Sequence, residues 1–221
     1  MKKKWLYGIA AGALAAVMCV GFAACGGTNA KDVKGEEFPA EKKEEMWQAA
    51  FADENFTNFK MVAKGTEKKE DGKAIKEEMI VIITEKGSYT KIPASMTNDK
   101  KAYEMYIEKA EDYEYVYVKD EDGKWVKVKE EAGKTPDLGK VLVASAIYSF
   151  KDQAENYEYS KEWKGYIVPD EPATSEAPVL KFKGGKLVAI YSKETDAGQD
   201  IVFTYGKQKI SFPKATELTE E

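Results

Sequence analysis

The sequence predicts an α+β domain made mostly of antiparallel strands, with a curved sheet whose concave face is covered by an N-terminal helix and a mid-chain helix. Three observations predict this fold. Alternating apolar and polar runs recur with glycine-bearing turns between them. The run 79–83 is apolar on both faces of its predicted strand. The second predicted helix is apolar most of the way round, so a sheet curved around that helix accounts for both apolar surfaces.

The first 27 residues have the pattern of a bacterial lipoprotein export signal. Three lysines at positions 2–4 precede an apolar stretch over 6–22, and Phe22-Ala23-Ala24-Cys25 provides small residues for a signal peptidase. The alternative is a membrane-spanning helix, but the apolar run is short and three glycines interrupt it. We therefore expect residues 1–24 to be removed, Cys25 to be lipidated, and residues 25–38 to be a flexible tether on the extracytoplasmic face of the cell membrane.

The folded part is predicted as one domain over 39–215, followed by a disordered tail over 216–221. Its first helix covers about 41–54 after Pro39, with one apolar stripe formed by Met46, Trp47, Ala50 and Phe51. Four hairpins are predicted from pairs of runs: 58–68 with 73–84, 113–118 with 124–128, 179–183 with 186–191, and 201–204 with 208–212.

The second helix is predicted to follow Thr135-Pro136-Asp137, with Thr135 as the cap and the proline in the first turn, and to end near Phe150. Its apolar residues form two stripes: Leu138, Val141, Leu142 and Tyr148, and Val143, Ile147 and Phe150.

Composition excludes several kinds of chemistry. The chain has no histidine, and its 34 basic residues are all lysines, so neither an imidazole base or ligand nor a bidentate arginine clamp is present. Cys19 leaves with the signal and a lipidated Cys25 is a thioether, which leaves no thiol. Loss of the three N-terminal lysines changes the formal charge from −5 to about −8. We expect no metal, no cofactor and no nucleic-acid partner.

Three near-motifs have simpler interpretations. Ser88-Tyr89-Thr90-Lys91 matches the S-x-x-K of penicillin-recognising enzymes, but it lies in a strand pattern and the partner motifs are absent. Gly133-Lys134-Thr135 resembles the end of a phosphate loop without the earlier glycine. Asp120 and Asp122 beside Gly123 resemble part of a calcium loop, and a hairpin turn explains them better.

The order of elements resembles the LolA-like lipoprotein superfamily. The resemblance rests on the Trp-bearing N-terminal helix, the hairpins, the mid-chain helix and the closing run Ile-Val-Phe-Thr-Tyr-Gly-Lys-Gln-Lys-Ile-Ser-Phe-Pro at 201–213. It implies an unclosed, half β-barrel with helices as a lid, and a role in carrying lipoproteins or glycolipids or in sensing the envelope. The best-studied carriers hold the lid with an arginine inside the barrel, which this chain does not have.

Two functions remain, neither of them enzymatic. The first is a lipid-tethered binding module for a lipid or other apolar ligand, because the predicted sheet and second helix enclose apolar surface. Its candidate lining residues are Met79, Val81, Ile83, Leu142 and Ile147, together with Tyr113, Tyr115 and Tyr117. The second is a structural or protein-interaction domain of the cell envelope, which predicts a solidly packed sheet and an exposed aromatic patch. An envelope hydrolase would need a carboxylate pair in a cleft. The sequence does not show such a pair, so we predict no catalytic residue.

Overall fold

The computed structural model describes residues 29–68, 74–97, 99–174, 176–192 and 200–218. The strands within these ranges are β1 (Phe59–Lys68), β2 (Ala74–Thr84), β3 (Gly87–Ile92), β4 (Tyr103–Lys109), β5 (Tyr113–Lys119), β6 (Trp125–Glu131), β7 (Glu158–Ser160), β8 (Gly165–Ile167), β9 (Val179–Lys183), β10 (Lys186–Tyr191), β11 (Asp200–Tyr205) and β12 (Thr216–Leu218). The helices are α2 (Lys43–Ala50) and α3 (Leu138–Ile147), with 3₁₀ turns η2 (Ala30–Asp32), η3 (Ala40–Lys42), η4 (Asp53–Phe56), η5 (Ala94–Met96), η6 (Tyr148–Phe150) and η7 (Ala154–Asn156).

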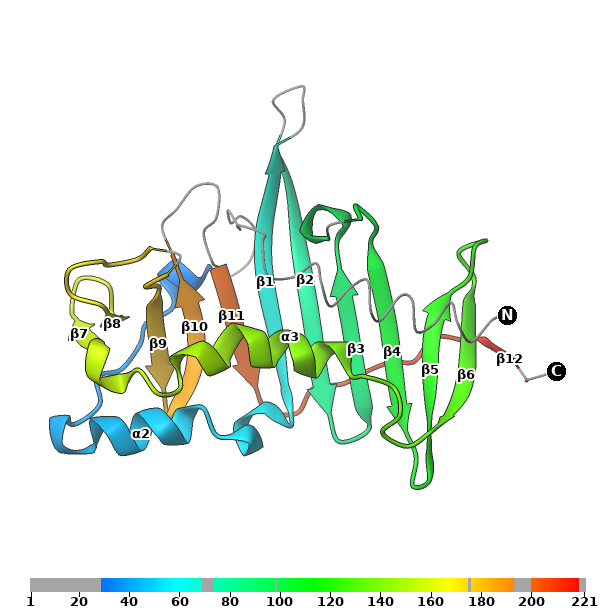
Figure 1. Cartoon of the computed structure of the whole chain (residues 1–221), viewed down its shortest axis with the longest axis horizontal. Helices are drawn as coiled ribbons and strands as arrows, with labels where there is room; N and C mark the ends of the chain where they lie inside the picture. Colours follow the sequence, from blue (N-terminus) through cyan, green and yellow to red (C-terminus); the bar gives the residue numbers. More distant parts are fainter. Residues whose placement is uncertain (1–28, 69–73, 98, 175, 193–199, 219–221) are drawn as a thin grey trace.

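The described strands form one sheet in the order β12-β6-β5-β4-β3-β2-β1-β11-β10-β9-β8-β7 (Figure 1). β12 runs parallel to β6, and the other pairs are antiparallel. β12 and β7 end this order without pairing with each other, so the described sheet is unclosed. The prediction of a mostly antiparallel α+β domain with two helices is confirmed.

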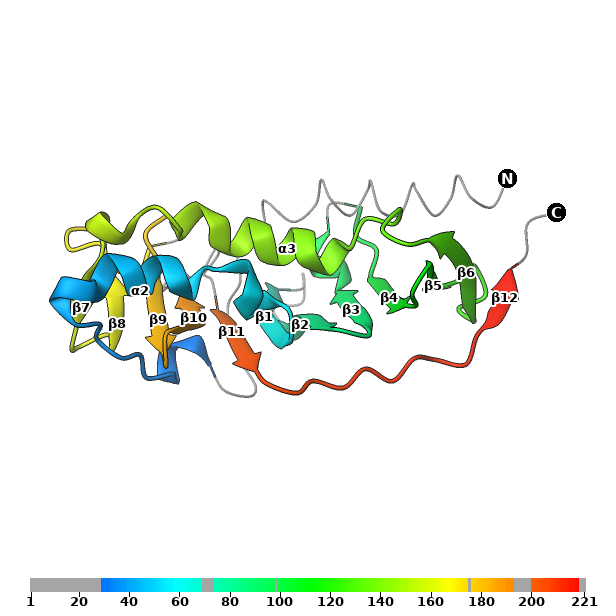
Figure 2. The same cartoon turned by 90° about the horizontal axis from the view of Figure 1, so that it is seen from below.

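Both helices lie on the same side of the sheet (Figure 2). α3 packs against β2 and β3, and α2 packs against β10 and the 3₁₀ turn η7. The predicted first helix is shorter than 41–54 because α2 ends at Ala50 and a separate 3₁₀ turn follows it. The prediction of Thr135 as the cap of the second helix is wrong: the Asp137 carboxylate accepts the Lys140 N–H, which places Pro136 before the helix.

Three of the four predicted hairpins are confirmed by the pairings β1–β2, β5–β6 and β9–β10. The fourth prediction is wrong, because 208–212 form no strand. β11 is already paired with β1 on one side and β10 on the other, so no free edge remains beside it for a return strand.

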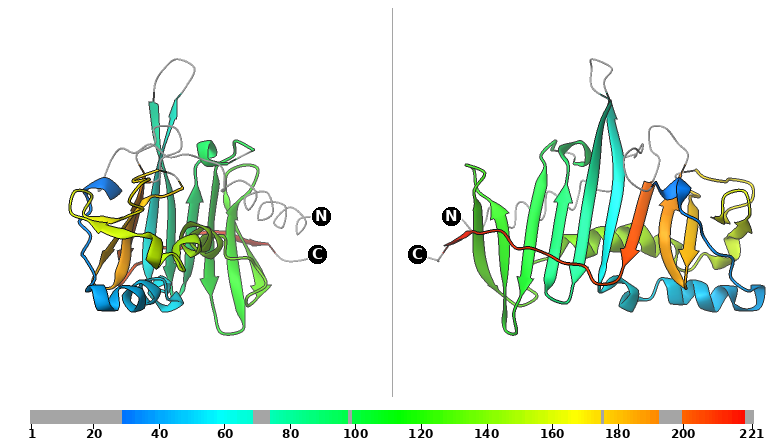
Figure 3. Two further views of the ribbon diagram at one scale, coloured as in Figure 1. Left: turned by 60° about the vertical axis from the view of Figure 1, so that its left-hand side comes forward. Right: turned by 180° about the vertical axis from the view of Figure 1, so that it is seen from behind.

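The chain instead crosses the side of the sheet opposite the helices and ends at the far edge (Figures 2 and 3). Thr216–Leu218 form β12, which pairs with Val126–Val128, where the sequence analysis predicted a disordered tail. We call residues 206–218 the C-terminal arm.

The N-terminal segment also differs from the prediction, since residues 29–38 of the expected tether pack onto the sheet beside β9–β11. The buried Lys181 ammonium donates to the carbonyl oxygens of Lys31 at 2.6 Å and Val33 at 2.8 Å. The buried Asp200 carboxylate accepts the Ala30 N–H at 2.6 Å. Buried charges need such partners, and the main chain of this segment supplies them. Residues 30–38 therefore belong to the folded domain, which the sequence analysis had started at residue 39.

Candidate functional site

The side of the sheet opposite the helices carries a continuous group of aromatic rings on β3–β6. We call this group the aromatic face: Tyr89, Tyr106, Tyr113, Tyr115, Tyr117 and Trp125. Period-two alternation puts the three β5 tyrosines on one side of their strand, as predicted. Cross-strand pairing then aligns Tyr89 with Tyr106, and Tyr106 with Tyr117.

Neighbouring rings of the aromatic face are in contact. Ring centroids are 4.6 Å apart for Tyr89 and Tyr106, 5.2 Å for Tyr106 and Trp125, and 5.3 Å for Tyr113 and Tyr115. Tyr117 is buried, whereas the other five rings are partly exposed. Aromatic side chains offer broad apolar contact area and have few rotamers to immobilise, so this face is suited to binding.

Lysines from β5 and β6 lie over these rings. The Lys127 ammonium is 3.9 Å from the Tyr115 centroid, the Lys129 ammonium is 4.0 Å from that of Tyr113, and the Lys119 ammonium is 5.0 Å from that of Trp125. These distances are typical of cation–π contacts. This side of the sheet carries charges of both signs, since Lys119 also forms an ion pair with Glu104 at 2.7 Å.

Two carboxylates fix the orientation of rings in this face. The Tyr89 hydroxyl donates to Glu104 at 2.9 Å, and the Tyr117 hydroxyl donates to Glu108. Burial and these carboxylates raise the pKa of both tyrosines. Burial opposes ionisation of Glu104, but donation from Lys119 and Tyr89 lowers its pKa below the ordinary value. Glu104 thus stays charged and both phenols stay protonated near neutral pH.

The C-terminal arm covers the middle of the aromatic face. The Phe212 ring stacks on Tyr117, with centroids 5.7 Å apart and an interplanar angle of 26°, and it meets Tyr106 at 6.3 Å. Further along the arm, Glu217 forms an ion pair with Lys127 at 3.2 Å. Part of the face is therefore already occupied by an aromatic and an acidic side chain of the same protein.

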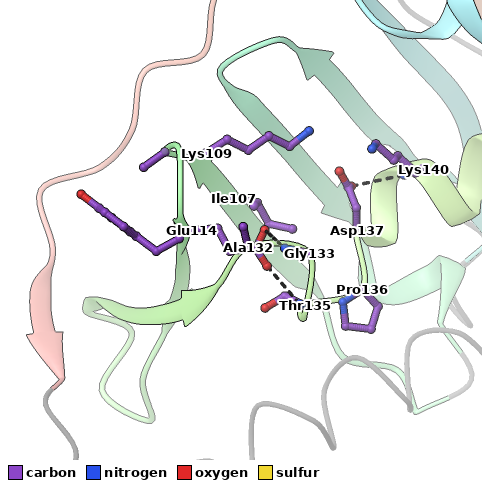
Figure 4. A pocket seen from close by; sticks show the side chains of 11 residues that line it. Ile107, Lys109, Glu114, Ala132, Gly133, Thr135, Pro136, Asp137 and Lys140 are labelled. Carbon is purple, nitrogen blue, oxygen red and sulfur yellow. Dashed lines mark hydrogen bonds between the residues drawn. The ribbon is translucent and has the colours of Figure 1, made fainter.

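A surface pocket of about 410 Å³ lies at the start of α3, where the β4–β5 and β6–α3 connections meet (Figure 4). Its carboxylates hold the local backbone. The buried Glu114 carboxylate accepts the N–H groups of Gly133 at 3.3 Å and Thr135 at 3.0 Å. Asp137 accepts the Ser88 hydroxyl at 3.1 Å besides capping α3. The residues that line the pocket are Ile107, Lys109, Ala110, Tyr113, Glu114, Ala132, Gly133, Thr135, Pro136, Asp137 and Lys140.

The structure divides the predicted ligand-lining residues between the two sides of the sheet. Those on β2 and α3 are at most 4% exposed and belong to the hydrophobic core between sheet and helices: Met79, Val81, Ile83, Leu142 and Ile147. The predicted tyrosines Tyr113, Tyr115 and Tyr117 lie on the aromatic face instead. The eight residues therefore do not surround one common cavity.

Two of the near-motifs found in the sequence lie in the described structure, and the predicted lipidation site does not. Ser88 and Lys91 point to opposite sides of β3, since Ser88 donates to Asp137 beneath α3 whereas Lys91 is exposed, so the S-x-x-K residues do not converge. The Asp120–Gly123 segment is the β5–β6 turn, in which Asp120 accepts the Lys124 N–H. Cys25 lies outside the described residues.

Neither a group of metal ligands nor a membrane-spanning helix occurs among the described residues. No group of three or more potential acidic or cysteine metal ligands occurs there. No helix in the same ranges has the length and hydropathy needed to span a membrane.

Comparison with known proteins gives no match to any protein-family model and no significant similarity to a curated protein. The function must therefore be argued from the structure itself.

Several residues on the side of the sheet that carries the aromatic face were not predicted as site residues. Trp125, Lys127 and Lys129 alternate with two valines along β6, and this pattern could have placed them on one side of the strand. Phe212 gives no comparable signal, because its position depends on the path of the arm across six strands.

Proposed function

We propose that this chain is a lipid-anchored domain of the bacterial cell envelope that binds a macromolecular partner through its aromatic face, without catalysis. The observation that carries the proposal is the group of partly exposed, mutually packed rings with lysines above them. Surfaces of this composition are typical of interfaces, where aromatic residues supply most of the binding energy.

The helix-covered side supports the same choice. The predicted lining residues on β2 and α3 belong to the packed core and are 0–4% exposed. Burying them against the helices stabilises the fold and leaves them inaccessible in this conformation. The aromatic face, in contrast, keeps ring surface and charged groups within reach of a partner.

The expected lipid anchor would hold the domain close to the membrane. The five residue-to-residue steps from Cys25 to Ala30 can span at most about 18 Å. Because the Ala30 N–H donates a hydrogen bond to the Asp200 carboxylate on β11, the η2 end of the domain would lie near the lipid surface. Replacing Cys25 with serine is expected to move the protein from the membrane fraction to the soluble fraction.

A photo-crosslinking experiment tests the binding role. A benzoylphenylalanine is placed at Tyr115 in the aromatic face or at the exposed Tyr148 at the end of α3, and cells that express the full chain are irradiated. We expect a discrete adduct from position 115 and none from 148. Adducts from 148 alone, or from neither position, would contradict the proposal.

The apolar-ligand function is a second candidate, with α3 as a lid over the concave side of the sheet as the LolA-like resemblance implies. One observation favours it. Beneath the start of α3, the Thr90 hydroxyl and one oxygen of Asp137 are buried without a hydrogen-bond partner among the described residues. Each such group weakens the helix–sheet contact by about 1–3 kcal/mol. Native mass spectrometry of the mature chain with lipid extraction tests this function: a co-purified lipid supports it, and a clean apo mass after incubation with membrane extract argues against it.

A further inference from the structure

The C-terminal arm occupies the aromatic face as an external peptide would. After Gly206, residues 207–215 form no helix or strand and cross the side of the sheet opposite the helices (Figure 3). The arm then adds β12 to the edge of β6. It follows the general mode in which an extended peptide joins a sheet edge through its main chain and fills surface sites with its side chains.

The contacts of the arm with the aromatic face and with β6 are of weak kinds. One aromatic ring, Phe212, stacks on the face. One partly exposed ion pair joins Glu217 to Lys127. The strand β12 has three residues and pairs in the parallel sense, which is less stable per residue than antiparallel pairing. A competing strand therefore has little to displace.

Among the described residues, β12 pairs with only part of β6. β6 extends over seven residues, Trp125–Glu131, and the β12 register covers Val126–Val128. Lys129 follows this register on the aromatic side, where its ammonium lies over Tyr113. A partner strand longer than three residues would therefore meet further backbone of β6 and a second lysine.

We propose that the β6 edge and the aromatic face bind an extended strand of a partner protein, one that carries an aromatic residue and carboxylates, and that the C-terminal arm occupies this site until the partner displaces it. The proposal rests on the proposed function, and it names the partner's chemistry. The Tyr106–Tyr117 surface under Phe212 accepts the aromatic ring. The ammonium groups of Lys127 and Lys129 pair with the carboxylates, as Lys127 pairs with Glu217 in the arm. A polyanion without aromatic groups could not make the ring contact with Tyr106 and Tyr117, and a neutral chain could not pair with the two lysines.

The test measures binding of a fluorescein-labelled peptide with the sequence of residues 206–218 to the mature lipidated chain in detergent. The tethered arm competes at an effective concentration on the order of millimolar, so the unmodified chain should bind the peptide weakly. The double variant Phe212→Ala/Glu217→Ala weakens the arm but leaves the site intact. We expect its affinity for the peptide to be at least about tenfold higher than that of the unmodified chain.

Two controls make the result specific. A peptide in which alanine replaces the phenylalanine should bind the arm-weakened variant at least about tenfold less tightly. Oxidised Val126→Cys/Thr216→Cys, whose Cα atoms are partners in the β12–β6 register, should lock the arm in place and abolish peptide binding.

Several outcomes would overturn the proposal. One is an arm-weakened variant with a native circular dichroism spectrum that does not bind the peptide, or binds the alanine peptide equally well. Another is tighter binding of an anionic polysaccharide than of the peptide. Arm-dependent dimerisation in light scattering would replace the partner strand with a second copy of this chain. If crosslinking from Tyr115 still gives an adduct in any of these cases, the binding role stands and only the strand mechanism fails.

Discussion

The two sides of the sheet are built from alternate residues of the same strands, yet they differ in composition and covering. On β1 and β2 the helix side presents Met61, Val81 and Ile83, none more than 3% exposed. On β3–β6 the other side presents tyrosines, lysines and glutamates, and the C-terminal arm crosses it (Figures 2 and 3). The first side provides the stability of the fold. The second does not hold the helices, and it is the side that we propose binds a partner.

The largest effect should distinguish two tryptophans on opposite sides of the sheet. Trp47 is fully buried, contacts the Phe182 ring with centroids 4.9 Å apart, and donates its indole N–H to the Phe150 carbonyl at 2.9 Å. Trp47→Ala is expected to lower the free energy of unfolding by about 3–5 kcal/mol. Urea denaturation followed by circular dichroism measures this change.

Trp125→Ala is the matched control on the aromatic face. Its ring is partly exposed and makes an edge contact with Tyr106, so the expected loss is at most about 1.5 kcal/mol. Equal losses at positions 47 and 125 would show that both sides contribute alike to stability, and the division proposed between them would be wrong.

The next effect concerns the closest approach of α3 to the sheet. A Cβ atom at Gly139 would lie 2.7 Å from the Thr90 hydroxyl oxygen and 2.9 Å from a methyl carbon of Val81. Gly139→Ala is therefore expected to destabilise the domain by about 1–3 kcal/mol through overpacking.

A double-mutant cycle separates this clash from a general helix effect. Thr90→Ala removes the nearest atom, so it should restore part of the stability lost in Gly139→Ala. Additive losses in the double variant, measured by the same denaturation, would contradict a contact between α3 and β3 at this point.

A smaller effect should appear at alkaline pH on the aromatic face. Burial and donation to carboxylates raise the pKa of Tyr89 and Tyr117 above the ordinary value of 10.0. Their contribution to stability is therefore complete below pH 10.0 and falls as the pH rises above it, because the unfolded chain loses these protons first. Tyr89→Phe/Tyr117→Phe should make this fall less steep.

The measurement is the unfolding midpoint in urea on both sides of pH 10.0 for the parent and the double variant. Lys181 acts in the opposite sense, since burial lowers its pKa to about 8 and its contribution rises with pH up to 10.5. The difference between the two proteins removes that common effect. Parallel pH profiles would show that these two phenols do not carry the alkaline sensitivity.

The smallest effect is expected from the arm itself. Phe212→Ala removes one ring stacked on the surface and should lower the free energy of unfolding by about 1 kcal/mol or less. The same change should increase cleavage after Lys214 in limited proteolysis, because the arm leaves the sheet more often. A loss of several kcal/mol would make the arm part of the core and exclude its displacement by a partner.

The sequence by itself determined the local structure of this protein. Period-two alternation with glycine turns predicted three correct hairpins, and helical spacing around Trp47 and Leu142 predicted both helices within a few residues. It also placed the β5 tyrosines on one side of their strand. These features depend on contacts between neighbours in the chain, so their signal is contained in short windows.

Only the tertiary structure decided which surfaces meet. β11 has no free edge, so the segment after Gly206 crosses the aromatic face and does not form a hairpin. The partners of Lys181 and Asp200 lie about 150 and 170 residues away, and they turn an expected tether into an ordered segment. The helices bury Met79 and Ile147 in the core, where the sequence predicted a ligand. Such outcomes depend on competition among distant segments for the same edge or face, and no local pattern records the result.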